Sequence, residues 1–145
     1  MNTNQKTLNE IYWACGFIDG EGNIRWNKNK GTKKENSTRS YGCAALQVAQ
    51  IDLFVLERLK NALGCGKIYG PYKQRYENGK PYYYYAVTGV KCIEVIKRIK
   101  PYLSPIKSKQ IEETIKQHEE QQKLPKLGNG IKLKKKLYGK TAKRN

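Results

Sequence analysis

The chain has 145 residues, and its 29 Lys and Arg against 12 Asp and Glu give a formal net charge of +17. This length allows one domain with a modest core and excludes separate catalytic and ligand-reading domains. The charge creates a strong positive potential around a small body and predicts an anionic polymer as partner. A Lys-rich coding bias or a ribosome-binding protein would give the same charge, so charge alone does not establish an enzyme.

Hydropathy and cysteine spacing bear on two further classes of protein. No apolar run approaches the roughly 20 residues of a membrane-spanning helix, and the first residues, MNTNQKTLNE, lack the apolar core of a secretory signal. The four cysteines are widely spaced, with only His118 as a further ligand, so no zinc site is expected. We therefore expect a soluble, intracellular, non-secreted protein with reduced thiols.

The first half of the chain predicts a helix and two strands. Apolar residues at spacings of three and four predict a helix over residues 5–20, capped by Thr7 or Asn9 and closed by Gly20 and Gly22. Asn23 to Lys28 and Tyr41 to Gln50 alternate apolar with polar side chains, which predicts strands with one polar face. The polar, basic residues 29–40 between them predict an exposed, mobile hairpin loop.

The second half repeats this order. Asp52 caps a helix that ends at Gly64, and its apolar side is formed by Phe54, Leu56, Leu59 and Leu63. Lys67 to Tyr72 and Tyr82 to Thr88 predict a second hairpin, in which Asn78-Gly79 supplies the positive φ angles of a tight turn. Residues 90–103 predict a third helix.

The C-terminal part is more polar. Residues 108–123 predict a mostly polar helix, and from Lys123 onward nine Lys or Arg occur without an acidic residue. We expect one domain over residues 1–122 and a basic tail over 123–145 that is flexible until it meets a phosphate backbone. The whole order predicts an α+β fold: a four-stranded antiparallel sheet with helices on one face.

Glycines and acids crowd the end of the first helix. Gly16, Gly20 and Gly22 lie there although a helical glycine costs about 1 kcal/mol relative to alanine. Their spacing leaves a face without bulk, which suits either close approach of another protein helix or packing on the chain's own sheet. Asp19 and Glu21 follow, where the helix dipole disfavours anions.

A divalent cation would neutralise these carboxylates. The helix-end carbonyl of Gly20 would complete an all-oxygen set that suits Mg²⁺, and a two-fold axis between paired helices would bring two copies of Glu21 together. The commoner fate of such acids is to be solvated at a helix end.

The segment ACGFIDGEG, residues 14–22, resembles the signature of the LAGLIDADG homing endonucleases, with Glu21 at the metal-binding acidic position. The αββαββα order over roughly residues 8–120 is similar as well. Ala14 and Cys15 depart from the usual Leu-Ala, and Glu21 replaces an Asp but still offers a carboxylate. Only one copy of the motif is present, which in this family implies a homodimer, paired through Ala14, Gly16, Phe17 and Gly20.

The resemblance implies a site-specific double-strand DNA endonuclease that cuts a long pseudo-palindromic target, uses Mg²⁺ or Mn²⁺, and is encoded in a mobile intron. Gln50 would order a water and Lys107 would stabilise phosphate charge. The plainer alternatives are that Gln50 only ends a strand and that Lys107 is a solvated surface charge. The resemblance also implies where the protein is located: in an organelle, such as a chloroplast or mitochondrion, or in the cytoplasm of a bacterium or phage host. Alternatives are a maturase that binds intron RNA, a non-cleaving DNA-binding regulator, and a basic structural nucleoprotein.

Strand alternation nominates the side chains that would read DNA in the major groove. Those expected on the open face are Arg25, Asn27, Gln47, Lys67, Tyr69, Tyr82 and Tyr84. Those expected against the helices are Ile24, Trp26, Leu46, Val48, Ile68, Tyr85 and Val87. Lysines expected to contact phosphates are Lys28, Lys30, Lys33 and Lys34. A buried tyrosine ladder under the helices is the alternative for half of the tyrosines.

Overall fold

The computed structural model describes residues 2–28 and 41–124. Its elements in chain order are α1 (Thr3–Glu21), β1 (Gly22–Lys28), β2 (Gly42–Gln50), α2 (Leu53–Leu63), β3 (Lys67–Tyr72), β4 (Tyr82–Thr88), α3 (Gly89–Ile99), the 3-10 turn η1 (Lys100–Tyr102) and α4 (Pro105–Lys123). The predicted order is confirmed. The expected loop 29–40, with Lys30, Lys33 and Lys34, and the tail beyond Leu124 lie outside the described residues.

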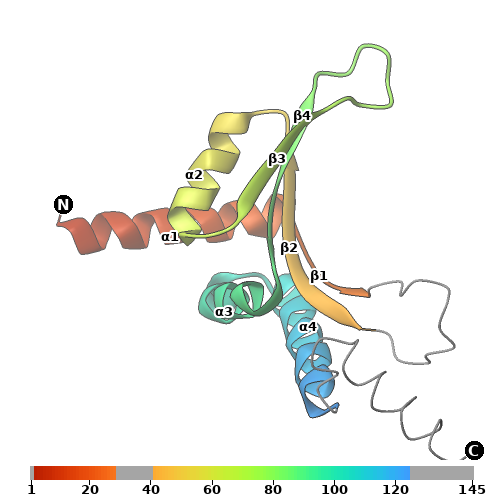
Figure 1. Cartoon of the computed structure of the whole chain (residues 1–145). Coiled ribbons are helices and arrows are strands. Elements are labelled where there is room, and N and C mark those ends of the chain that lie inside the picture. Colours follow the sequence, from red (N-terminus) through yellow and green to blue (C-terminus); the bar gives the residue numbers. More distant parts are fainter. Residues whose placement is uncertain (1, 29–40, 125–145) are drawn as a thin grey trace, which may run out of the picture.

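The four strands form one sheet in the order β1-β2-β4-β3, and every neighbouring pair is antiparallel. The helices lie on one side of this curved sheet and leave its other side open (Figure 1). The α+β class and the four-stranded antiparallel sheet are therefore confirmed. Within the described ranges, every helix is too short or too polar to span a membrane.

The core lies between the covered face of the sheet and the helices. Leu46 on β2 and Tyr85 on β4 are fully buried, and α1, α2 and α3 contribute Ile18, Leu59 and Ile96 to the same cluster. The buried hydroxyl of Tyr85 donates to the carbonyl of Cys65 at 2.8 Å. Alternation in β1, β2 and β4 is as predicted, because every second side chain reaches this cluster.

Helix boundaries differ from the prediction at three ends. Asn2, rather than Thr7 or Asn9, caps α1, because its Oδ1 accepts the N–H of Gln5 at 2.8 Å. The third helix stops at Ile99 and tightens into η1, and α4 begins at Pro105 behind the cap Ser104. Proline suits the first turn of α4 because its missing N–H has no helical partner there.

Two further expectations are wrong. Phe54 is 72% exposed and does not join Leu56, Leu59 and Leu63 in the core, because its spacings from these residues in the sequence place it on the opposite side of α2. The hairpin between β3 and β4 does not turn with Asn78-Gly79 as its central pair: the hydrogen-bonded turn spans Tyr76 to Gly79, closed by the Gly79 N–H and the Tyr76 carbonyl at 3.0 Å, and Gly79 has no positive φ.

Candidate functional site

The junction between α1 and β1 positions the acid of the motif. Gly22 is buried there, and a Cβ on it would lie 2.8 Å from Cγ2 and the carbonyl oxygen of Ile18. Glycine is therefore required for the chain to pass directly from helix to strand. This places Glu21, the last residue of α1, on the surface at the start of the sheet.

The two acids of the motif have different surroundings. The Oδ1 of Asp19 accepts the N–H of Ser104 at 3.0 Å, and this bonding to Ser104, followed by the charge of Lys107, lowers the pKa of Asp19 below its ordinary value. The side chain of Glu21 forms no ion pair or hydrogen bond with any other described residue. Asp19 thus joins α1 to the start of α4, while Glu21 is free to bind a ligand.

Lys107 lies on the same junction. Its Nζ donates to the carbonyl oxygen of Gly22, the residue after Glu21, and its backbone N–H bonds to the Ser104 cap. An ammonium group has three donors, so two remain for another ligand. The sequence-predicted Lys107 is therefore close to the motif through the backbone of Gly22.

Two adjoining cavities meet at Glu21. The larger, of about 520 Å³, is lined by residues of the α1–β1 junction, the end of β2, the β3–β4 loop and β4: Glu21, Ala49, Gln50, Ile51, Lys73, Gln74, Arg75, Tyr76 and Tyr82. The smaller, of about 390 Å³, lies on the open sheet face and is bounded by Glu21, Asn23, Gln47, Ala49, Tyr82 and Tyr84. The structure thus brings Glu21 and Gln50 to one cavity, and Lys107 lines neither.

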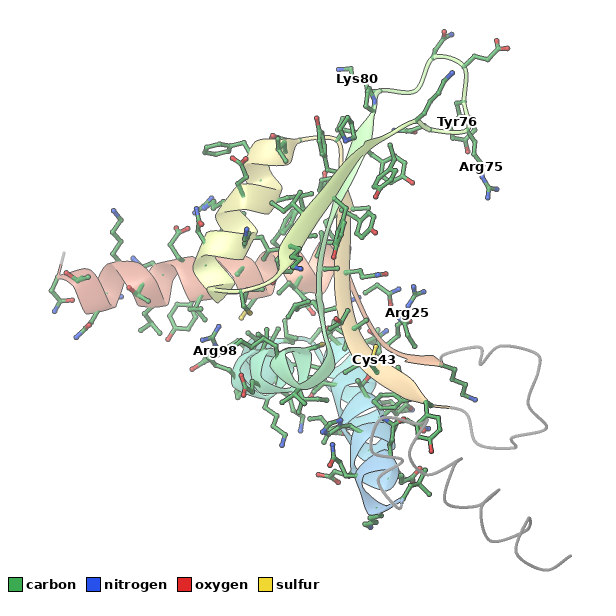
Figure 2. All side chains as sticks on the ribbon, viewed as in Figure 1. Arg25, Cys43, Arg75, Tyr76, Lys80 and Arg98 are labelled. Atoms are coloured by element: carbon green, nitrogen blue, oxygen red, sulfur yellow. The ribbon has the colours of Figure 1, made fainter. Side chains whose placement is uncertain are left out.

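The open face of the sheet has a polar part and an aromatic part. On β1 and β2, Nη2 of Arg25 donates to Oε1 of Gln47 at 3.1 Å. On β3 and β4, the ring of Tyr84 stacks on those of Tyr69 and Tyr72, with centroids 4.9 and 5.5 Å apart. A hydrogen bond with Tyr72 raises the pKa of Tyr84 above its ordinary value. Figure 2 shows Arg25 projecting on this open side, whereas Arg98 lies among the helices.

Sequence reasoning missed four residues of this surface. Asn23 lines the smaller cavity, and its alternation with Arg25 was the signal for it. Tyr72 is three residues from Tyr69, so a regular strand would place it on the other face; a register shift between them returns it to the same side. Gly70-Pro71 within the strand is typical of such an irregularity. Lys73 and Arg75 follow in the loop, where no periodicity applies.

The motif also leaves one face of α1 without a packing partner among residues 2–28 and 41–124. A Cβ built on Gly16 or Gly20 would meet nothing within 4 Å, so this face is open and flat. The expectation that Ala14 lies on it is wrong: Ala14 is 0% exposed, because it stands one turn before the core residue Ile18. The half-buried Phe17 stacks on Trp13 at 5.3 Å along the edge of the flat face.

Contacts with α2 hold the Trp13–Phe17 edge of the open α1 face. The guanidinium of Arg58, on α2, lies 3.9 Å from the ring centre of Trp13 and makes two bonds of 2.9 and 3.0 Å to the carboxylate of Glu10. These contacts hold α1 against α2 and fix the edge of its open face.

The described residues do not form a complete metal site within one chain. No group of three or more His, Cys, Asp or Glu side chains among them is placed to hold an ion. Glu21 supplies one carboxylate, and the carbonyl of Gly20, close to the helix end, has no helical N–H to accept. These are the hard oxygen donors that Mg²⁺ prefers, but they need a second set.

The fold and site define a class of α+β proteins in which an acidic helix end lies beside an open polar sheet face. The family model of the LAGLIDADG endonucleases matches residues 14–118, and this chain belongs to that family. No curated protein sequence matches the chain.

Solved structures share the fold. The homing endonuclease I-CvuI in complex with its target is 21% identical, with a TM-score of 0.57 over 75% of this chain and 65% of that one. The meganuclease I-CpaMI bound to uncleaved DNA is also 21% identical, with a TM-score of 0.59 over 83% of this chain and 41% of that one. The homing endonuclease I-TnaI is 21% identical, with a TM-score of 0.52 over 73% and 69%. This chain spans 64 to 65% of the length of the I-CvuI chains.

Proposed function

We propose that this chain is one subunit of a homodimeric, site-specific double-strand DNA endonuclease that requires Mg²⁺ or Mn²⁺. The observation that carries the proposal is the cavity shared by Glu21 and Gln50 at the boundary of the open polar face. Membership of the endonuclease family and the DNA complexes among the similar structures support it.

The reaction is hydrolysis of one phosphodiester in each strand. The oxygen of a water forms a bond to phosphorus, one phosphorus–oxygen bond to deoxyribose breaks, the water loses a proton and the released oxygen gains one. Gln50 orients the attacking water, and the two remaining donors of Lys107 stabilise the phosphate charge. Glu21 and the carbonyl of Gly20 would hold the divalent ion, which supplies Lewis-acid stabilisation of that charge.

The second set of ligands comes from a second copy of the chain. If the flat faces of two α1 helices pack about a two-fold axis through Gly16, Phe17 and Gly20, two Glu21 carboxylates approach each other. Replacing Gly20 by Leu would add bulk to this face, where a Cβ meets no atom of the described residues within 4 Å. We expect this variant to sediment as a folded monomer and to lose cleavage; an unchanged dimer would place the interface elsewhere.

The open sheet face supplies the DNA-reading surface. We propose that Arg25, Asn27 and Gln47, with Lys67, Tyr69 and Tyr84 on the other hairpin, contact bases in the major groove. Lys28 and Lys30, and the basic tail 123–145 beyond the domain 1–122, contact phosphates and set the salt dependence of binding.

The first experiment is incubation of the purified protein with a randomised duplex library, with Mg²⁺ or with EDTA, followed by sequencing of the cut ends. We expect Mg²⁺-dependent cuts at one long sequence of two related half-sites. Tight binding without cutting would overturn the endonuclease and leave a DNA-binding regulator on the same fold. Weak binding without sequence preference would indicate a basic nucleoprotein.

A further inference from the structure

The loop between β3 and β4 forms a wall of the Glu21 cavity. Residues 73–76 of this loop line the same cavity of about 520 Å³ as Glu21 and Gln50. The loop is folded on itself: the N–H of Gly79 donates to the carbonyl of Tyr76 at 3.0 Å, and a Cβ on Gly79 would lie 2.7 Å from the Cβ of Gln74. This packing gives the wall a defined shape.

More cations than carboxylates line this cavity. Among the described residues, Glu21 is the one carboxylate that lines the cavity, while Lys73 and Arg75 are cations of the loop that line it. Neither Lys73 nor Arg75 makes an ion pair or hydrogen bond with another described residue. Lys107, the cation expected from the motif, is bonded to the Gly22 carbonyl outside the cavity lining. The unpaired cations of the cavity itself therefore come from the loop.

A phosphate is the anion that this arrangement suits. A guanidinium presents several N–H donors in a planar fork that matches two phosphate oxygens, and an ammonium adds a point charge. Charge accumulates on the phosphate oxygens as water attacks, so donors already in place stabilise the transition state more than the bound substrate.

We propose that Arg75, with Lys73 beside it, contacts the non-bridging oxygens of the scissile phosphate and is a further catalytic residue of the Glu21 site. This inference rests on the proposed nuclease function. It assigns to the β3–β4 loop part of the charge stabilisation that the motif, Gln50 and Lys107 would otherwise supply alone.

The chain offers a matched control in the same loop. Lys80 is exposed like Arg75 but does not line the cavity. Figure 2 shows Arg75 on the open side of the sheet, as is Arg25, and Lys80 on the other side of the loop. All three loop cations are exposed, so their replacement by Gln should leave the thermal midpoint of unfolding unchanged.

The test compares Arg75→Gln, Arg75→Lys, Lys73→Gln and Lys80→Gln on the target DNA. Single-turnover cleavage is followed at saturating protein in Mg²⁺, and Kd is measured in Ca²⁺. We expect Arg75→Gln to slow cleavage about 100-fold with Kd changed less than about threefold, Arg75→Lys to recover part of the rate, and Lys80→Gln to cleave like the wild type. Cleavage by Arg75→Gln at the rate of Lys80→Gln would overturn the inference.

A binding measurement decides the loop's role even without cleavage. Each lost phosphate contact lowers the slope of log K against log salt by about one. We expect that change for Arg75→Gln and none for Lys80→Gln. A wild-type protein that binds duplex DNA without cutting would overturn the proposed function, and an unchanged slope for Arg75→Gln would overturn the loop contact separately.

Discussion

Tyr84 and Tyr85 are neighbours on β4 with the same side chain and opposite surroundings. Tyr85 is 0% exposed, and its hydroxyl donates to the Cys65 carbonyl at 2.8 Å. Burial is the first cause that raises its pKa, ahead of its contacts with Cys65 and Cys92. Tyr84 is only partly buried, and it stacks with Tyr69 and Tyr72 on the face that carries no helix.

This pair shows how one strand packs a core with one face and exposes polar and aromatic groups on the other. The covered face uses its polar atoms to satisfy one another inside the core, whereas the open face leaves donors, acceptors and ring surfaces available to a ligand. Substitutions on the two faces should therefore differ in kind, one set changing the free energy of unfolding and the other changing DNA binding or cleavage.

The largest expected effect is a loss of cleavage that leaves the core unchanged. Glu21→Gln removes the charge of an exposed carboxylate that has no partner among the described residues. We expect Mg²⁺-dependent cleavage to fall at least about 100-fold, which corresponds to about 2.7 kcal/mol. DNA binding in Ca²⁺ and the free energy of unfolding should stay close to wild type. Equal loss of binding and cleavage would make Glu21 a structural residue.

The next effect tests the two tyrosines directly. Tyr85→Phe leaves the Cys65 carbonyl without its partner in a buried position, so we expect a loss of about 1 to 3 kcal/mol in urea unfolding. Tyr84→Phe should change stability by less than about 0.5 kcal/mol. If the two variants unfold at the same urea concentration, the contrast between the faces is wrong.

A smaller and more local effect is expected on the polar part of the open face. Arg25→Ala removes the donor that holds the Gln47 amide, so a base position contacted by this pair should lose discrimination. We expect about 1 to 2 kcal/mol less preference at that position in binding to a library of single-base variants, with stability unchanged. A uniform loss across all sequences would instead identify Arg25 as a phosphate contact.

The smallest effect concerns the structural acid of the motif. The pKa of Asp19 in the folded protein is below its ordinary value of 3.8, so its contribution to stability is present above that pH and is lost as the pH falls through the folded pKa. Asp19→Asn should therefore be slightly less stable than wild type at pH 7, and the difference should shrink toward pH 3 in urea unfolding. A difference that is the same at both pH values would exclude the charge as its cause.

Local chemistry predicted most of the fold. Asp52 and Gly64 bracket α2 because a cap and a left-handed glycine act within one turn, and alternation placed Arg25, Gln47 and Tyr84 on the open face. One error came from the helical period. Phe54 was assigned to the core because it is apolar, although a residue two positions before Leu56 lies on the opposite side of a helix.

The residues of the candidate site also fall into those that the sequence predicted and those that it did not. Glu21 was found because its position at a helix end is unfavourable and the motif explains it. Ala14 was placed wrongly although its spacing of four from Ile18 already indicated the core side of α1. Lys73 and Arg75 could not be found, because their approach to Glu21 depends on where the sheet brings a loop more than fifty residues away in sequence.

The contact between α4 and the start of β2 has a consequence for self-association. The side-chain amide of Gln121 accepts the N–H of Gly42 at 2.8 Å and donates to its carbonyl at 3.0 Å, as a neighbouring strand would. Pairing with β4 starts only at Ala45, so this stretch of β2 would otherwise present an unpaired backbone edge. Such edges recruit strands from other molecules. Gln121 thus satisfies the two backbone groups of Gly42 that a strand from another molecule would otherwise bind.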